Sequence, residues 1–571
     1  MHRKAKIAFF GKENAMKRKW IISILSLVLS SLLLLACAKT DNTQTEADET
    51  ADPNAVVEVP EGELTLGELT LGEPSFDGQA PDGIPQMPEG GFPDGQMPEG
   101  MQPPQGWNGE GMPQMPEGGF PGGQMPEGMQ PPQGWNGEGQ PPEPPQGGPG
   151  GNPTAGGDVP GAPGPGGSAA SVSYTAANEI NAATAESGKT YASATADENA
   201  LLVATGEAVT ITNPSVTKTG DSDGGDACNF YGLNAGVLCK DGAQVTITGG
   251  TIETSASGAN GVFSYGGNGG RNGAAGDGTT VTISDTVITT TGSGSGGIMT
   301  TGGGTTYANN LTVTTSGQSS APIRTDRGGG TVVVSGGTYT SNGLGSPAIY
   351  STADITVSDA TLVSNQSEGA VIEGKNSITL NDCTLTANNT QRNSNATFLD
   401  SIMLYQSMSG DADSGTAAFT MTGGSILSKS GHVFHVTNTN AVITLSGVAI
   451  TNEDHADVLL SVCADGWSGA KNIATLKAIR QTLSGTILVG SDSELTLSLT
   501  DGSSITCAIS GAIQNAKGET VSSEVGTVHV TLDATSTWTL TADTYITSFE
   551  GDASRIVTNG FSLYVNGVKV A

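Results

Sequence analysis

The sequence is poor in aromatic and in charged residues. Aromatic residues make up 5% of the 571 residues and charged residues 14%, whereas glycine occurs 84 times. A compact globule of this composition would bury little apolar area per residue. The composition therefore excludes an ordinary globular domain over the whole length and favours either disorder or a repetitive β structure with many turns.

Basic residues are also scarce, with 23 Lys and Arg against 56 Asp and Glu, which gives a formal net charge of −33. This balance argues against a nucleic-acid partner, because binding to phosphates requires a basic face. The six cysteines contain no CxxC motif, so a zinc site of the usual spacing is not indicated. Cys228 and Cys239 are close enough to bridge a loop, or they are small buried residues.

The N-terminal segment reads as an export signal. Lys17, Arg18 and Lys19 precede an apolar run over 20–36, which ends in Leu34-Leu35-Ala36-Cys37. This segment resembles a lipoprotein signal peptide with its lipobox. The resemblance implies that Cys37 receives a lipid, becomes the mature N-terminus and anchors the chain to the membrane. A single transmembrane anchor and an ordinary signal peptide are the alternatives. We assign residues 1–36 to the signal peptide. Met16 directly precedes the basic cluster, which suggests that it is the true start.

Residues 37–167 are acidic at first and then rich in Pro, Gly, Gln and Met. The segment 87–93 recurs as 115–121, and 105–110 recurs as 133–138, both at an offset of 28 residues. Because the segment has few β-branched residues, the apolar surface that it could bury cannot offset the conformational entropy lost on folding. We therefore expect a disordered stalk. The stalk is a spacer through the cell wall, or its proline-rich stretch is a ligand for an aromatic groove.

From residue 168 to about 470 a short sequence motif repeats. Two apolar anchors lie five residues apart, as in Ile247/Ile252 and Ile283/Ile288, and a third follows ten residues later, as in Val262 and Ile298. Three fixed inward points per coil, with variable length only at the corners, predict a triangular solenoid. We therefore expect an all-β, single-stranded parallel β-helix, and we take it as right-handed from the chirality of parallel crossovers.

Residues 471–571 repeat less clearly, and we expect degenerate coils with a C-terminal cap. Asn559-Gly560 and Asn566-Gly567 are typical of hairpin turns. Phrases such as 297–304, 323–330 and 346–354 resemble the adhesin-like or pectate-lyase-like β-helix repeat lipoproteins of Gram-positive bacteria. That resemblance implies a fold and a surface role, and it brings no catalytic residues.

The third strand of each coil carries the candidate binding residues. The positions directly after each third anchor, and two residues further on, should point away from the core because side chains alternate along a strand. They form a groove for an extended polymer, in which arginine grips a carboxylate and tyrosine stacks on sugars, or they form a ladder of cross-strand pairs. The candidate residues are Tyr265, Arg324, Asp326, Arg327, Tyr350, Glu373 and Lys375.

The sequence leaves three functions open. The preferred one is a lipid-anchored surface protein, monomeric and outside the cell membrane, that binds polysaccharide or another extended ligand. A lyase or hydrolase acting on an acidic glycan and a ligand-free coat protein are the alternatives. We expect no required cofactor, although Asp221, Asp223 and Asp226 have the oxygen density of a weak calcium loop.

Overall fold

The structure is a computed structural model that describes residues 172–222, 225–269, 275–467 and 471–571. The predicted signal peptide with Cys37, the predicted stalk and Asp223 lie outside the described residues. Within those residues, no helix has the length and apolar character required to cross a membrane.

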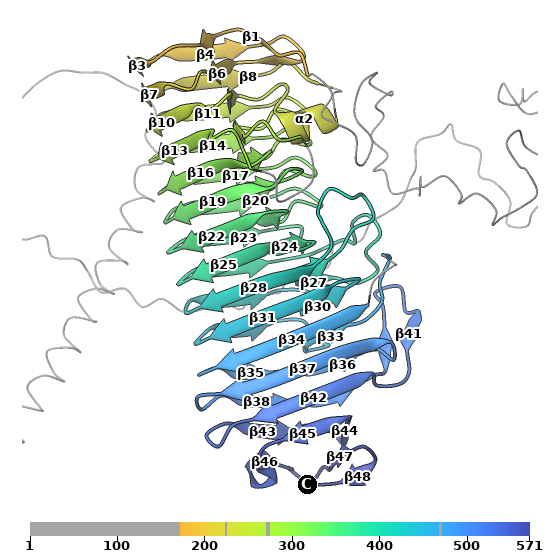
Figure 1. Ribbon diagram of the computed structural model, residues 1–571. Coiled ribbons are helices and arrows are strands. Elements are labelled where there is room, and N and C mark those ends of the chain that lie inside the picture. Colours follow the sequence, from red (N-terminus) through yellow and green to blue (C-terminus); the bar gives the residue numbers. More distant parts are fainter. Residues whose placement is uncertain (1–171, 223–224, 270–274, 468–470) are drawn as a thin grey trace, which may run out of the picture. The chain divides into compact units, whose positions relative to one another are not determined.

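The described chain forms a parallel β-helix, which confirms the predicted fold class. Successive coils stack along one axis, and each coil adds one strand to each of three long parallel sheets (Figure 1). We call them the first, second and third sheets, in the order in which the chain passes through them. Chain order and sheet order agree because every strand pairs with its equivalent in the next coil.

The first sheet is the longest, with 14 strands among the described residues. It consists of β3 (Thr184–Ser187), β7 (Ala208–Thr212), β10 (Gln244–Thr248), β13 (Thr280–Ser284), β16 (Gly304–Asn309), β19 (Gly330–Ser335), β22 (Asp354–Ser358), β25 (Ser377–Asn381), β28 (Thr416–Thr422), β31 (Asn440–Ser446), β34 (Asn472–Ile479), β37 (Ser493–Thr500), β42 (Thr527–Leu532) and β45 (Ser548–Glu550).

The second sheet has 10 strands in the described chain and ends earlier than the first. It consists of β4 (Thr190–Ser193), β8 (Ser215–Lys218), β11 (Thr251–Thr254), β14 (Val287–Thr290), β17 (Thr312–Thr315), β20 (Thr338–Ser341), β23 (Thr361–Ser364), β26 (Thr384–Ala387), β29 (Ser425–Ser428) and β32 (Ala449–Asn452).

The third sheet has 13 strands over the same described ranges and carries most of the predicted site residues. It consists of β2 (Glu179–Ile180), β6 (Leu201–Ala204), β9 (Val237–Lys240), β12 (Val262–Tyr265), β15 (Ile298–Thr301), β18 (Ile323–Thr325), β21 (Ile349–Ser351), β24 (Ala370–Glu373), β27 (Asp400–Tyr405), β30 (His432–Thr437), β33 (Val458–Val462), β36 (Thr486–Val489) and β39 (Ile509–Ser510).

The C-terminal coils keep the first sheet but replace the second by a separate four-stranded sheet of β35 (Thr482–Ser484), β38 (Ser504–Cys507), β43 (Thr537–Leu540) and β46 (Ile556–Val557). Asn566-Gly567 forms the predicted hairpin turn between β47 (Leu563–Val565) and β48 (Val568–Lys569), both with positive φ. Asn559-Gly560 is also a turn, but it joins strands that do not pair with each other. The remaining elements are β44 (Thr544–Ile546), which pairs with β47, the pairs β1 (Thr175–Ala176) with β5 (Glu198–Asn199) and β40 (Ile513–Gln514) with β41 (Thr520–Ser522), the helix α2 (Asp226–Tyr231) and the 3-10 turn η1 (Ala553–Arg555).

The predicted anchors form one continuous core. Ile247, Ile252 and Val262 are at most 1% exposed and belong to a single apolar cluster that runs from Ile180 to Leu563. Burying one such side chain contributes about 1.5–3 kcal/mol, so the repeated column is the main source of stability.

The turn between the first and second sheets explains the recurring Asp, Asn and Gly. Asp285, Asn310, Asp359 and Asp382 occupy it with φ between 50° and 56°. Asn and Asp tolerate this left-handed conformation, whereas β-branched residues do not. These acidic residues therefore have a conformational reason to be there.

Ile349 and Ile372 each lie ten residues after a second anchor, Tyr339 and Leu362, and this spacing predicts that they pair as third anchors. That register is wrong. Ile349 of β21 pairs with Ala370 of β24, and Ile372 lies opposite Ser351, two residues further along. Both Ala370 and Ile372 point into the core, so the period-2 pattern identified the correct face but not the correct partner. As a result Tyr350 lies beside Val371 and not beside Glu373. Glu373 lies two residues further along β24, where its neighbour in the next coil is Tyr405.

Candidate functional site

The outer face of the third sheet is not bare at its N-terminal end. Phe263 and Met299 follow their inward anchors as predicted, but both are 0% exposed rather than open to solvent. They form a second apolar cluster with Phe230 and Tyr231 of α2, which lies across this face. The helix belongs to an insertion at a coil corner. The alternation of side chains along the strands therefore could not predict that α2 covers this face.

Tyr265 belongs to this covered region. It is 8% exposed, and its ring lies 5.7 Å from that of Tyr231 in an edge-on contact. Burial raises the pKa of the Tyr265 hydroxyl to about 12. Tyr265 therefore packs beneath α2, and little of its side chain is exposed to solvent.

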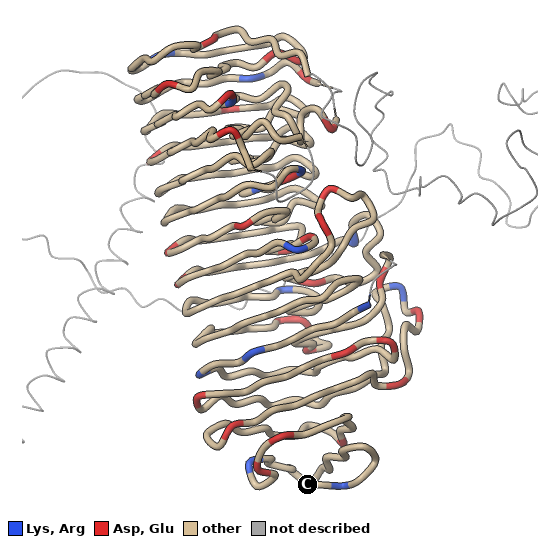
Figure 2. Tube along the Cα trace, in the orientation of Figure 1, with Lys and Arg blue, Asp and Glu red and all other residues tan. Residues whose placement is uncertain are grey.

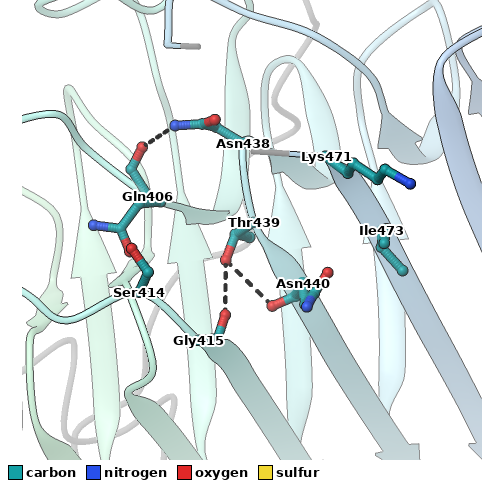
Figure 3. A pocket seen from close by; sticks show the side chains of 8 residues that line it. All are labelled: Gln406, Ser414, Gly415, Asn438, Thr439, Asn440, Lys471 and Ile473. Carbon is teal, nitrogen blue, oxygen red and sulfur yellow. Dashed lines mark hydrogen bonds between the residues drawn. The ribbon is translucent and has the colours of Figure 1, made fainter. Parts of the chain in front are cut away.

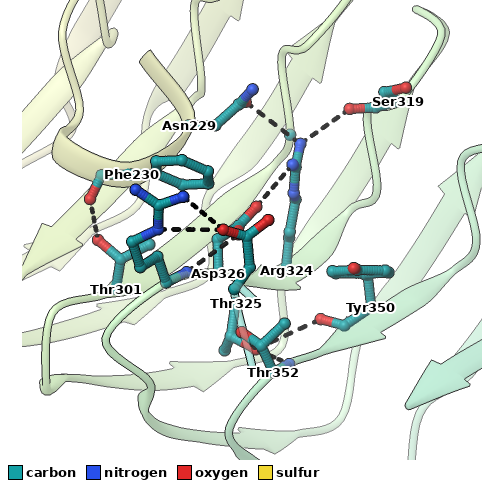
Figure 4. A network of polar contacts seen from close by, with 12 residues as sticks. Asn229, Phe230, Thr301, Ser319, Arg324, Thr325, Asp326, Tyr350 and Thr352 are labelled. Atoms are coloured by element: carbon teal, nitrogen blue, oxygen red, sulfur yellow. Dashed lines mark hydrogen bonds and ion pairs between the residues drawn. The ribbon is translucent and has the colours of Figure 1, made fainter. Parts of the chain in front are cut away.

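Arg324 of β18 forms an ion pair with Asp326, which directly follows that strand. Arg324 Nη2 lies 2.8 Å from Asp326 Oδ2, and Arg324 Nη1 donates to the carbonyl of Ser319 at 2.9 Å and to Asn229 Oδ1 at 3.4 Å (Figure 4). Both side chains are mostly buried, at 12% and 6% exposure. Burial raises the pKa of Asp326 to about 7 although the Arg324 charge opposes this shift. The guanidinium is thus already bound to a carboxyl group and to a backbone carbonyl.

Arg327 is held in the same way by a loop far along the chain. Its Nε and Nη2 donate to Asp411 Oδ1 at 3.0 and 2.6 Å, and its guanidinium lies 4.0 Å from the centre of the Phe230 ring. Asp411 comes from the loop 406–415, so Arg327 joins that loop to α2. A charged group in an ion pair and over an aromatic face has little left to offer a ligand.

Glu373 forms the centre of a buried hydrogen-bond network and is 2% exposed. It accepts hydrogen bonds from the hydroxyls of Tyr350, Tyr405 and Ser407, the one from Tyr405 at 3.1 Å. Burial raises its pKa above the ordinary value, and these three donors oppose the shift. Lys375 pairs with Asp413 at 2.9 Å and is the one predicted charge of this group that is largely exposed, at 44%.

Neither alternative describes these side chains: most are too buried for an open groove, and their charges do not pair across neighbouring strands as in a ladder. Arg324 pairs with Asp326, two residues further along the chain, whereas Arg327 and Lys375 pair with the loop 406–415. Figure 2 shows that many of the charged positions lie at strand ends and in the connecting loops, which leaves long stretches of the strands uncharged.

A pocket of about 430 Å³ lies at the corner where the third sheet passes to the first, beside the loop 406–415. Most of the lining residues carry an amide or a hydroxyl, but the surface that they turn into the pocket is mainly apolar. Some of the polar groups bind one another: Asn438 Nδ2 donates to the carbonyl of Gln406 at 2.7 Å, and Thr439 Oγ1 donates to that of Gly415 at 3.4 Å (Figure 3). Asn440 and Lys471 are exposed at its rim. The lining residues are Gln406, Ser414, Gly415, Asn438, Thr439, Asn440, Lys471 and Ile473.

Sequence reasoning missed this pocket. Its residues come from the corners of successive coils, where side-chain alternation ends and loop length varies. Asn438 has a φ of 55°, a turn conformation that marks the corner but does not reveal a cavity. The only signal in the sequence is the insertion between β27 and β28.

A second polar network, largely buried, lies beside Phe398. Ser461 Oγ lies 2.7 Å from Nδ1 of both His432 and His435, and His435 Nε2 lies 3.3 Å from Asp465 Oδ2. Burial lowers the pKa of His432 to about 3, so its ring is neutral near pH 7. Serine, histidine and aspartate in contact are reminiscent of a nucleophile–base–carboxylate set, but Ser461 and His435 are 0% exposed, so no substrate reaches them in this conformation.

The predicted calcium loop is only partly described. Asp221 Oδ1 accepts a hydrogen bond from the backbone N–H of Ser257 at 2.7 Å, and Asp226 lies near Arg327 and Asp411, which affect its pKa. Asp223 lies outside the described residues. In the parts of the chain that are described, no three Asp, Glu, His or Cys side chains converge as metal ligands. Cys228 and Cys239 are buried and do not bridge each other.

Comparison of the chain with protein-family models, with curated proteins and with solved structures finds no match. The fold is therefore established by the chain's own sheets, and the resemblance to adhesin-like and pectate-lyase-like lipoproteins stays a prediction.

Proposed function

We propose that this chain is an exported, lipid-anchored surface protein whose β-helix binds a neutral polysaccharide. The observation that carries the proposal is the pocket at the corner between the third and first sheets, in which a mainly apolar surface is bordered by residues with amides and hydroxyls. Such groups donate and accept hydrogen bonds without charge, as sugar hydroxyls require. A volume of about 430 Å³ is within the ordinary range for a small-ligand site.

The charges on the third sheet favour a neutral ligand over an acidic one. Arg324 and Arg327 are mostly buried and already bound to Asp326 and Asp411, so neither guanidinium is free to bind a uronate carboxylate. The chain as a whole carries a formal charge of −33, which repels polyanions at low ionic strength. The same pairing weakens the case for a lyase on acidic glycans, because that reaction needs a cation beside the substrate carboxylate.

The test is binding of the purified chain from Ala38 onward to an array of neutral and acidic glycans. We expect Asn440→Ala and Lys471→Ala to weaken binding to a neutral glycan about fivefold each, since one lost hydrogen bond is worth ~1 kcal/mol. Asn309→Ala and Lys477→Ala are matched controls, because both residues are exposed on the outer face of the first sheet.

Unchanged binding in both pocket variants would remove this pocket from the proposal. Binding confined to acidic glycans would contradict the neutral-ligand argument. Release of sugar products from a bound glycan would replace binding by catalysis as the function.

A further inference from the structure

Two acidic side chains are buried side by side at the N-terminal ends of two neighbouring strands of the third sheet, β24 and β27. Gly369 N donates to the carbonyl of Ser401 at 2.8 Å, and Ala370 pairs with Ile402, so Glu368 and Asp400 are neighbours in successive coils. They are 7% and 1% exposed. Stacked parallel strands are about 4.8 Å apart, which holds the two carboxyl groups close together.

An amide from the adjacent loop joins this pair. Asn389 lies in the segment 388–399 that connects β26 to β27, and it is 2% exposed. Its Nδ2 donates to Glu368 Oε1 at 3.1 Å and to the backbone carbonyl of Asp400 at 3.2 Å. The amide therefore occupies a position enclosed by oxygen atoms from both coils.

Two oxygen atoms of this group have no partner. Among the described residues, Asp400 Oδ1 and Asn389 Oδ1 are buried and accept no hydrogen bond. Burial raises the pKa of both Glu368 and Asp400, and the charge of Glu368 raises that of Asp400 further. Buried oxygens that lack a donor are uncommon, and an ion is one of the causes.

We propose that Glu368, Asn389 and Asp400 bind a calcium ion. Calcium prefers carboxylate, amide and carbonyl oxygens, and two ionised carboxylates balance its charge. The amide orientation is compatible, because rotating the Asn389 side-chain amide by half a turn replaces its nitrogen by the unpartnered oxygen at the same position. His432, which pairs with Asp400 in register, is already bound to Ser461, so the set remains all oxygen.

A calcium ion at this position ties the segment 388–399 to the third sheet. That segment also carries Thr397, whose N–H and hydroxyl both donate to Asp465 Oδ1, at 2.7 and 2.5 Å. The proposed site is distinct from the acidic corner around Asp221, which belongs to the insertion before α2.

The experiment measures calcium content and thermal stability of the full chain, purified in mild detergent at neutral pH. We expect the wild-type chain to retain one more calcium ion than Glu368→Gln or Asp400→Asn after extensive buffer exchange. We also expect its melting temperature to rise with the logarithm of free calcium and to fall with a chelator, because the ion binds the folded state. Both variants should lose this dependence.

Two controls separate this site from weak binding by an acidic chain. Glu253→Gln removes an exposed glutamate of the second sheet, and Asp359→Asn removes an exposed carboxylate in a turn between the first and second sheets; both should behave as wild type. The proposal is overturned if calcium affects wild type and Glu368→Gln equally. It is also overturned if an infrared band of a protonated carboxyl persists in excess calcium and disappears in Glu368→Gln, because the pair then shares a proton.

Discussion

Arg327 offers the sharpest test of how the insertions on the third sheet hold together. Its guanidinium contacts Asp411 of the loop 406–415 and the Phe230 ring of α2, and the two side chains of the ion pair are 11% and 19% exposed. We predict that Arg327→Met, which keeps most of the apolar stem, loosens both insertions and leaves the stacked coils folded.

The magnitude follows from the geometry. Removing one partner of a fully buried ion pair costs about 3–5 kcal/mol, and an exposed pair about 0–1 kcal/mol. For this mostly buried pair together with a cation–π contact, we expect ~3 kcal/mol of lost local stability. Local opening then becomes roughly a hundredfold more frequent in both segments. Solenoid coils depend on their neighbours alone, so the core should change little.

Hydrogen exchange followed by mass spectrometry measures this effect segment by segment. In Arg327→Met, protection should fall in 406–415 and in α2 but not in β13 or β25. The double variant Arg327→Met/Asp411→Asn should recover part of the loss, because a neutral amide does not need a cation. Unchanged protection in α2, or strictly additive effects of the two substitutions, would refute the reasoning.

Three further predictions concern the core, pH and the thiols. Ile323→Ala should cost about 2–5 kcal/mol in urea unfolding, since Ile323 is 0% exposed in the apolar column, whereas Met408→Ala, at 58% exposure, should cost little; equal costs would contradict the core assignment. The His432 pKa of about 3 in the folded chain lies below its ordinary value, so its contribution to stability is complete above about pH 6.5 and is lost as pH falls towards 3; His432→Gln should flatten that part of the stability curve, and an unaltered slope would contradict this prediction. Burial raises the pKa of Cys239 to about 12, so Ellman's reagent should modify this thiol only after unfolding, and rapid modification of the native chain would show that it is exposed.

The core could be predicted from the sequence because it obeys one local rule. Ile247, Ile252 and Val262 recur at fixed spacings, and each spacing translates directly into an inward position. The limit of that rule is visible at Ile349, where Ala370 and Ile372 satisfy the alternation equally well and the sequence alone selected the wrong partner. A period of two specifies a face and not a register.

The candidate site could be predicted only in part, because its contacts join residues from different coils. The sequence identified Arg327 and Glu373 as unusual, but Asp411, the partner of Arg327, is placed by a loop conformation that no periodicity describes. Glu373 contacts Tyr405 through a strand register that the spacing of the anchors did not predict. The pocket beside the loop 406–415 was missed for the same reason. Corner residues are constrained by neighbouring insertions, and those constraints are not local in the chain.

This arrangement also explains why the outer face carries polar networks in a chain that is poor in charged residues. Arg327 follows β18, and Asp411 follows β27, three strand spacings or about 14 Å along the third sheet. A loop that bridges such a distance must be fixed at both ends, since its own residues pack little against the core. Ion pairs, cation–π contacts and buried carboxyl groups supply directional contacts that apolar packing lacks. The stacked coils therefore provide stability, whereas the inserted loops provide the specific surface, and the polar residues at their junction determine whether that surface is formed.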